Sequence, residues 1–136
     1  MDELINLILD KLKNLDVPRN KIKNEEEFED FVYNMLEILI DNYDRSILLK
    51  RQQTSNRETR QLKPDIIVGL NDILIELKYD IQNLNDIYRL FYQAVKYSRI
   101  ANELLIIFVF DPQRKLTRED IQDLKRNKNV SVIRIV

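Results

Sequence analysis

Residues 63–78 read KPDIIVGLNDILIELK, two apolar runs separated by a glycine and an asparagine. Both runs are rich in residues that favour strands, and Gly69 and Asn71 are residue types that turns require. Side chains alternate along a strand, so Glu76 and Lys78 share one face of the second run while aliphatic side chains occupy the other. The stretch therefore predicts a β-hairpin with charged groups on one face.

The turn determines which residues face each other across this hairpin. A loop of two or of four residues centred on Leu70 and Asn71 places Asp65 directly across from Glu76. Opposed residues of antiparallel strands have Cβ atoms roughly 4.5–5.5 Å apart, so both carboxylates can reach one divalent cation. A solvated, salt-bridged strand face and an ordinary Pro-Asp turn are the non-catalytic interpretations. The conjunction of two carboxylates and Lys78 on an apolar strand favours a catalytic site, because buried charges are costly unless paired or bound to metal.

The composition excludes most other catalytic chemistries. The 136 residues include no histidine, no cysteine and one glycine, and the net charge is −1. Zinc sites built from cysteine and histidine, Ser-His-Asp and thiol nucleophiles, and glycine-rich phosphate loops are therefore excluded. Carboxylates, lysine, tyrosine or a hard cation such as Mg²⁺ remain available. The acidic start and the absence of an apolar run near ~18 residues predict an intracellular, cytoplasmic protein without a membrane span.

Outward from the hairpin, the sequence predicts one α/β domain over residues 1–136, with a mixed central sheet flanked by helices. Hydrophobic periodicity predicts nine elements. They are helices over 3–15, 25–42, 84–101 and 117–126, and strands over 46–53, 65–68, 73–79, 104–110 and 130–136. Thr117 and Asp120 predict a capping box at the start of the last helix.

The spacing of the charged residues resembles a known motif. A Pro-Asp dipeptide ending at Asp65, followed after ten residues by Glu76, Leu77 and Lys78, is similar to the signature of the PD-(D/E)XK nuclease superfamily. The resemblance implies a restriction-endonuclease-like αβββαβ core over about residues 25–110, with an extra N-terminal helix and a C-terminal α-β extension. It further implies that Asp65, Glu76 and the Leu77 carbonyl hold Mg²⁺, which Mn²⁺ can replace, and that Lys78 orients or activates the attacking water.

The helix predicted over 25–42 offers a further acidic residue. On a helical wheel Glu29 falls inside the apolar arc, whereas the acids at 26, 27, 30 and 37 fall outside it. Glu25 is also inside, but it lies at the helix end, where capping explains it. Residues 28–36 are similar to the first helix of archaeal Holliday junction resolvases, and this similarity implies that Glu29 is catalytic and a further metal ligand. The alternative is that Glu29 lies at the rim of the core.

A second resemblance lies on the helix after the hairpin. Gln93, three residues and Tyr97 resemble the Gln-x-x-x-Tyr motif of RecB-family nucleases. The resemblance implies that both side chains place the substrate strand and support the site. The alternative is a polar flank of an amphipathic helix.

Basic residues near Asp65 in sequence indicate a nucleic-acid contact. A cationic rim beside a metal site would neutralise phosphates and hold DNA in register, although a solvated charged loop is the alternative. The candidates are Lys50, Arg51, Arg57, Arg60 and Lys63.

These features together predict a Mg²⁺-dependent nuclease that hydrolyses DNA phosphodiester bonds. Junction-resolving, end-processing and restriction or repair types remain open, and RNA is not excluded. The alternative is a catalytically inactive nuclease-fold protein that acts as a binding or assembly module. We also expect a homodimer, formed through one of two apolar surfaces. The first is the stripe Leu4, Ile5, Ile8, Leu12 and Leu15, which otherwise covers the sheet, and the second is Tyr88, Phe91 and Tyr92.

Overall fold

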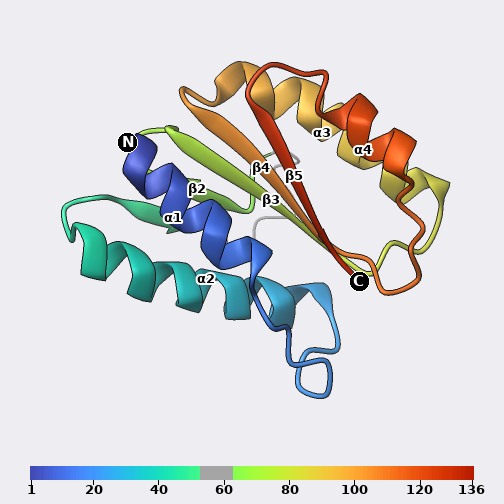
Figure 1. Cartoon of the computed structure of the whole chain (residues 1–136), viewed down its shortest axis with the longest axis horizontal. Helices are drawn as coiled ribbons and strands as arrows, with labels where there is room; N and C mark the ends of the chain where they lie inside the picture. The colour runs from blue at the N-terminus through green and yellow to red at the C-terminus, as the bar shows by residue number, and fades with distance from the viewer. Residues whose placement is uncertain (53–62) are drawn as a thin grey trace.

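The computed structural model describes residues 1–52 and 63–136, in which five strands form one mixed sheet with helices on both faces (Figure 1). Strands β1 to β3 pair antiparallel, and β3 to β5 pair parallel. The strands lie side by side in chain order: β1 (Leu49–Arg51), β2 (Ile66–Val68), β3 (Ile73–Tyr79), β4 (Leu104–Phe110) and β5 (Val130–Ile135). The α/β class and the mixed sheet predicted from the sequence are confirmed.

The helices divide between the two faces of the sheet (Figure 1). Helices α1 (Asp2–Lys13) and α2 (Glu25–Tyr43) pack on one face, and α3 (Leu84–Ile100) and α4 (Arg118–Leu124) on the other. Strand β3 alternates between the two cores, since Ile75 belongs to the first and Leu74 to the second. Glu76 therefore lies on the face of the sheet that α3 covers.

The β2–β3 hairpin has the predicted register. Ile66 pairs with Ile75 and Val68 with Ile73, across a four-residue turn. Gly69 has a φ of 70°, a left-handed conformation that glycine adopts without steric cost. Asp65 directly precedes β2, so continuing this register places it opposite Glu76.

An aromatic cluster holds the start of α2 against the ends of the central strands. The Phe28 ring centroid lies 5.9 Å from that of Tyr79 and 5.5 Å from that of Phe108. Asn24 caps the helix by accepting a hydrogen bond from the Glu27 backbone N–H at 2.8 Å. Capping therefore falls to Asn24 and not to the neighbouring acid at position 25, whose predicted capping role is wrong. The cluster brings the acidic first turns of α2 to the carboxyl end of β3.

The first strand begins later than predicted, since the structure has it at Leu49–Arg51 and the sequence pattern gave 46–53; residue 53 of that prediction lies outside the described residues. Asp44 accepts hydrogen bonds from both the backbone N–H and the hydroxyl of Ser46, at 2.9 and 2.7 Å. The Ile47 N–H then bonds to the Asp44 carbonyl at 3.2 Å. This turn occupies the residues that the sequence pattern assigned to the start of the strand.

Helix α1 packs its apolar stripe inside the chain. Leu4, Ile8 and Leu12 are completely buried in the core that contains the sheet. The stripe was predicted either to form a dimer surface or to cover the sheet, and the structure shows that it covers the sheet. Tyr88 and Tyr92 on α3, from the second predicted surface, are 62% and 58% exposed. Among the residues that the structure describes, none of the helices has both the length and the apolarity needed to cross a bilayer.

Candidate functional site

Two carboxyl groups meet where the β2–β3 hairpin opens. The Asp65 Oδ2 accepts a hydrogen bond from the Leu77 backbone N–H at 2.8 Å, which fixes Asp65 against β3. Glu76 is 6% exposed, and its Oε2 has no hydrogen-bond partner among the described residues. A buried polar atom without a partner costs folding free energy. The arrangement is thus unfavourable for stability as it stands.

The surroundings of this pair favour its protonated forms. Burial raises the pKa of Asp65 to about 6, although the hydrogen bond from Leu77 opposes that shift. Burial also raises the pKa of Glu76 well above its ordinary value, and the Asp65 charge adds to the effect. Two carboxyl groups this close cannot both ionise cheaply. Binding of a cation between them would remove that cost.

Lys78 lies two residues beyond Glu76 on the same strand face. Its Nζ is 3.5 Å from Asp86 Oδ1 and 3.9 Å from Glu25 Oε2, and its side chain is 20% exposed. Asp86 is itself held by the Gln82 backbone N–H, which donates to it at 2.8 Å. The sequence reasoning did not identify this pairing, because an acidic residue in the first turn of a helix is ordinarily explained by the helix dipole.

Glu29 is buried beside the pair, as its position on the helical wheel predicted. Burial raises its pKa to about 7, with a smaller rise from the Asp65 charge and an opposing effect of Arg51. The Arg51 Nε lies 3.4 Å from Glu29 Oε1, and a second nitrogen of Arg51 lies 2.6 Å from Asp30. The same guanidinium sits 5.2 Å from the ring centre of Tyr33. Arg51, a predicted phosphate contact, is thus engaged with α2.

Helix α3 contributes the two residues of the Gln-x-x-x-Tyr resemblance. Gln93 is 6% exposed and lines the same cavity as the carboxylates. Tyr97 lies one turn further and is almost completely buried, with no hydrogen-bond partner for its hydroxyl among the described residues. Burial raises the pKa of Tyr97, and the charges of Glu76 and Asp65 raise it further. Tyr97 therefore lies close enough to the acidic pair to respond to its charge.

These groups surround a cavity of about 200 Å³. Two cationic residues, Lys78 and Arg89, line it together with five acidic residues: Glu25, Glu29, Asp65, Glu76 and Asp86. Within residues 1–52 and 63–136, no three acidic, histidine or cysteine side chains gather closely enough to form a metal centre on their own. The structure thus brings Asp65, Glu76, Lys78 and Gln93 to one cavity, whereas Glu29 lies at its wall in an ion pair and does not complete a three-ligand cluster.

The predicted phosphate contacts are placed in different ways. Lys50 is exposed on β1, and Lys63 is exposed just before the hairpin. Arg57 and Arg60 lie outside the described residues. Arg89, which lines the cavity, was not among the five predicted contacts; the sequence offers it only as part of an alternative DNA path over Lys50, Arg51, Arg89, Lys96 and Arg99.

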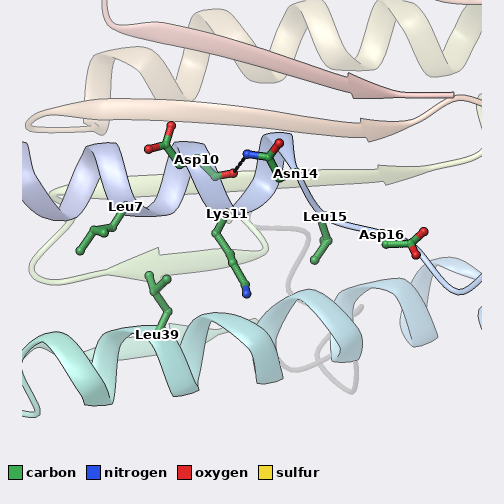
Figure 2. Close-up of a pocket in the computed structure, with 7 residues that line it drawn as sticks. All are labelled: Leu7, Asp10, Lys11, Asn14, Leu15, Asp16 and Leu39. Carbon is green, nitrogen blue, oxygen red and sulfur yellow. Dashed lines mark hydrogen bonds between the residues drawn. The ribbon is translucent and has the colours of Figure 1, made fainter.

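A second depression, of about 430 Å³, lies between α1 and α2 and shares no residue with the site. Figure 2 shows Leu7 and Leu15 of the α1 side and Leu39 of α2 pointing into the space between the two helices. The three leucines line it together with four polar or charged residues: Asp10, Lys11, Asn14 and Asp16. It offers no cluster of catalytic groups.

The comparison with known proteins gives no relative for the chain. No protein-family model, curated protein or solved structure matches it. The geometry of the cavity at the open end of the hairpin is therefore the ground on which a function is proposed.

Proposed function

We propose that this chain is a divalent-cation-dependent nuclease of the PD-(D/E)XK type that hydrolyses DNA phosphodiester bonds. One observation supports the proposal most strongly. Asp65 and Glu76 lie opposite each other at the open end of the hairpin, with Lys78 on the same face of β3. The element order from α2 to β4, which follows the αβββαβ pattern, supports it further.

The residues present fit a hard divalent cation. Asp65 and Glu76 supply carboxylate oxygens, the ligands that Mg²⁺ and Mn²⁺ prefer. The unpartnered Glu76 Oε2 is an oxygen atom for which the described residues provide no donor. Asp65 and Glu76 would hold the cation, with the Leu77 carbonyl as a further oxygen. A cation there supplies a Lewis acid for a phosphodiester.

The side chains around the pair have distinct roles in this proposal. Lys78 presents an ammonium group at the cavity, where it donates hydrogen bonds to the attacking water or to a phosphate oxygen as negative charge develops. Asp86 and Glu25 hold the Lys78 Nζ in place. Arg89 lines the same cavity and can pair with a neighbouring phosphate.

Glu29 and the Gln93–Tyr97 pair are assigned supporting roles. Glu29 lines the cavity beside the acidic pair, and the Asp65 charge helps to raise the pKa of Glu29, so we assign it a supporting role in the charge balance of the site. Gln93 is polar at the cavity wall and can donate to a sugar or phosphate oxygen. Tyr97 is buried in the second core, on the same face of the sheet as Glu76, and we assign it a packing role beside the acidic pair.

The direct test is cleavage by the purified chain. Fluorescent linear duplex, single-stranded and four-way-junction DNA, and a single-stranded RNA, are incubated with Mg²⁺, with Mn²⁺ or with EDTA. We expect cleavage that requires the cation and is abolished in Asp65→Asn and in Glu76→Gln, with both variants folded by circular dichroism. Lys13→Met, which changes an exposed lysine at the end of α1, outside the cavity and outside the predicted phosphate contacts, serves as the matched control.

Two other results would contradict parts of the proposal. Full activity in both acidic variants would remove the hairpin from the mechanism. DNA binding by wild-type protein without cleavage under any metal would favour the inactive nuclease-fold module. The predicted homodimer is checked separately, by the mass from light scattering at tens of micromolar.

A further inference from the structure

Helix α3 exposes two tyrosine rings next to the cavity. Tyr88 and Tyr92 are 62% and 58% exposed, whereas Tyr97 of the same helix is 1% exposed. Within the described residues, neither exposed ring stacks on another aromatic ring or on a cation. The two residues are four positions apart, so their rings lie one above the other on one helix face.

Cationic residues are interleaved with these rings. At 100° per residue and with Tyr88 at 0°, the helix presents Arg99 at about 20°, Tyr92 at about 40°, Lys96 at about 80° and Arg89 at about 100°. Arg89 and Arg99 are exposed, and Lys96 is half-buried. The arc contains no acidic residue, although acidic residues slightly outnumber basic ones in the whole chain.

The arc is continuous with the candidate site. Gln93 follows Arg89 at about 140°, and both residues line the cavity that contains Asp65 and Glu76. The acidic residue of α3, Asp86, falls beyond Gln93 on the cavity side, where Lys78 neutralises it. A polymer that leaves the cavity past Arg89 therefore meets cations first and the two rings next.

We propose that this face of α3, composed of Tyr88, Arg89, Tyr92, Lys96 and Arg99, binds single-stranded DNA that leads into the site. Tyrosine rings stack on the faces of unpaired bases, and arginine and lysine side chains contact the phosphates between them. The inference rests on the proposed function, because it identifies the substrate of that site as a single strand. In a duplex the base faces are already covered by neighbouring base pairs, so the rings would find no partner.

Charge disfavours a second copy of the chain on this face. A two-fold symmetric contact places the same patch against itself, so Arg89, Lys96 and Arg99 of one copy would face the same cations of the other. Like charges across an interface are unfavourable. The phosphate backbone of a single strand carries the complementary charge.

The experiment measures binding in EDTA, where a metal-dependent activity is silent. Fluorescence anisotropy of a labelled thymidine 20-mer and of a duplex of equal length is recorded for wild-type protein and three variants. These are the double variant Y88A/Y92A, its conservative counterpart Y88F/Y92F, and Tyr43→Ala, which removes a partly exposed tyrosine of α2 as a matched control. Circular dichroism confirms that each variant is folded.

We expect Y88A/Y92A to bind the 20-mer about 100-fold more weakly than wild type, with about tenfold lost for each ring. Y88F/Y92F keeps both rings and should bind within about twofold of wild type, as should Tyr43→Ala. Replacing Arg89 and Arg99 by alanine should reduce the slope of log K against log salt by about 1.4, or about 0.7 for each lost phosphate contact on a single strand.

Three results would overturn the inference: wild-type affinity in Y88A/Y92A, tighter binding of the duplex than of the 20-mer, or a wild-type dimer that Y88A/Y92A converts to a monomer. The last would assign the face to self-association. Failure of the single-strand inference can be told apart from failure of the proposed nuclease function. If the protein cleaves duplex DNA but no single strand, in a metal-dependent manner, the single-strand inference is wrong and the nuclease function stands. If the 20-mer binds through the two tyrosines and no DNA is cleaved, the nuclease function is wrong and the single-strand inference stands.

Discussion

The two ends of the β2–β3 hairpin each contain an aspartate, and the two aspartates have opposite surroundings. At the turn, the Asp72 carboxylate accepts a hydrogen bond from the Leu70 N–H at 3.3 Å and lies 3.5 Å from the Asn102 amide nitrogen. At the open end, Asp65 faces Glu76, which has an unpartnered buried oxygen. The Asp72 carboxylate stabilises a turn, whereas the buried pair of Asp65 and Glu76 opposes folding when both groups are ionised, although Asp65 also accepts the Leu77 N–H. Glu76 lies in the buried part of β3. A buried carboxylate that lowers the free energy of unfolding is typical of a group that binds a ligand or takes part in catalysis.

After loss of either carboxylate, which abolishes cleavage, the largest expected effect at the open end comes from the Lys78 ammonium group. Lys78→Met should lower the cleavage rate at saturating DNA by about 100-fold, or about 2.7 kcal/mol of barrier, because it removes a donor at the developing charge. Single-turnover kinetics measures this rate, with Lys13→Met as the exposed control. If the Lys78→Met protein cleaves at the wild-type rate, Lys78 has no role in catalysis and only the carboxylates at the open end remain as catalytic candidates.

Burial of the acidic pair should make the free energy of unfolding depend on pH. Asp65 has a pKa of about 6 in the folded chain against an ordinary value of 3.8, so between about pH 4 and 6 the folded state binds more protons than the unfolded state. The free energy of unfolding should therefore fall by about 1–3 kcal/mol as the pH rises through this window in EDTA.

Urea denaturation at a series of pH values measures that decline. The double variant D65N/E76Q should lose most of it and should exceed the stability of wild type at pH 7, because no carboxylate is left to ionise inside the hairpin. If the free energy of unfolding of the double variant falls with pH as much as that of wild type, other acidic groups cause the fall.

Glu29 tests how far the open end extends into α2. Glu29→Gln should slow cleavage by about tenfold, or about 1.4 kcal/mol, because it removes an acidic group from the wall of the cavity that contains Asp65. Glu26→Gln and Glu37→Gln, which alter exposed acids of the same helix, should have no effect on the rate. An inert Glu29→Gln would confine the site to the hairpin and α3.

The smallest effect is expected at the turn. Gly69→Ala should lower the free energy of unfolding by about 1 kcal/mol, because the φ of 70° is unfavourable for a residue with a Cβ and because the added Cβ would displace the Asp72 carboxylate. Cleavage should stay at the wild-type rate, since the turn lies at the far end of the strands from Glu76. Urea denaturation and the cleavage assay are run on the same protein. A tenfold loss of cleavage would show that the two ends are coupled, and the contrast between them would no longer hold.

The sequence predicted those features that depend on local chemistry. Gly69 and Asn71 determined the turn, and the turn determined the pairing of Asp65 with Glu76. Thr117 and Asp120 form the expected capping box, with the side chain of each accepting a backbone N–H of the other at 3.0 Å. In each case residues close in sequence determine the geometry, so one amino-acid sequence is enough to predict that geometry.

Features that depend on contacts between distant elements were not predictable. The ion pair between Lys78 and Asp86 requires knowing how α3 docks on β3. The engagement of Arg51 with α2 requires the crossing of α2 over β1. Strand periodicity overestimated β1, because it does not register that Asp44 and Ser46 form a hydrogen-bonded turn. The roles of the site residues remain predictions for the experiments above.

The packing of α1 against β5 has a consequence for synthesis of the chain on the ribosome. Leu4, Ile8 and Leu12 lie in one core with Ile133, and the Arg19 guanidinium donates a hydrogen bond to the Val136 carbonyl. At roughly 5–20 residues per second, β5 is made roughly 6–24 s after α1. Helix α2 contacts α1 earlier, but the sheet beneath it is complete only with β5. Until β5 has been made, the apolar face of α1 therefore lacks part of the surface that covers it in the folded chain.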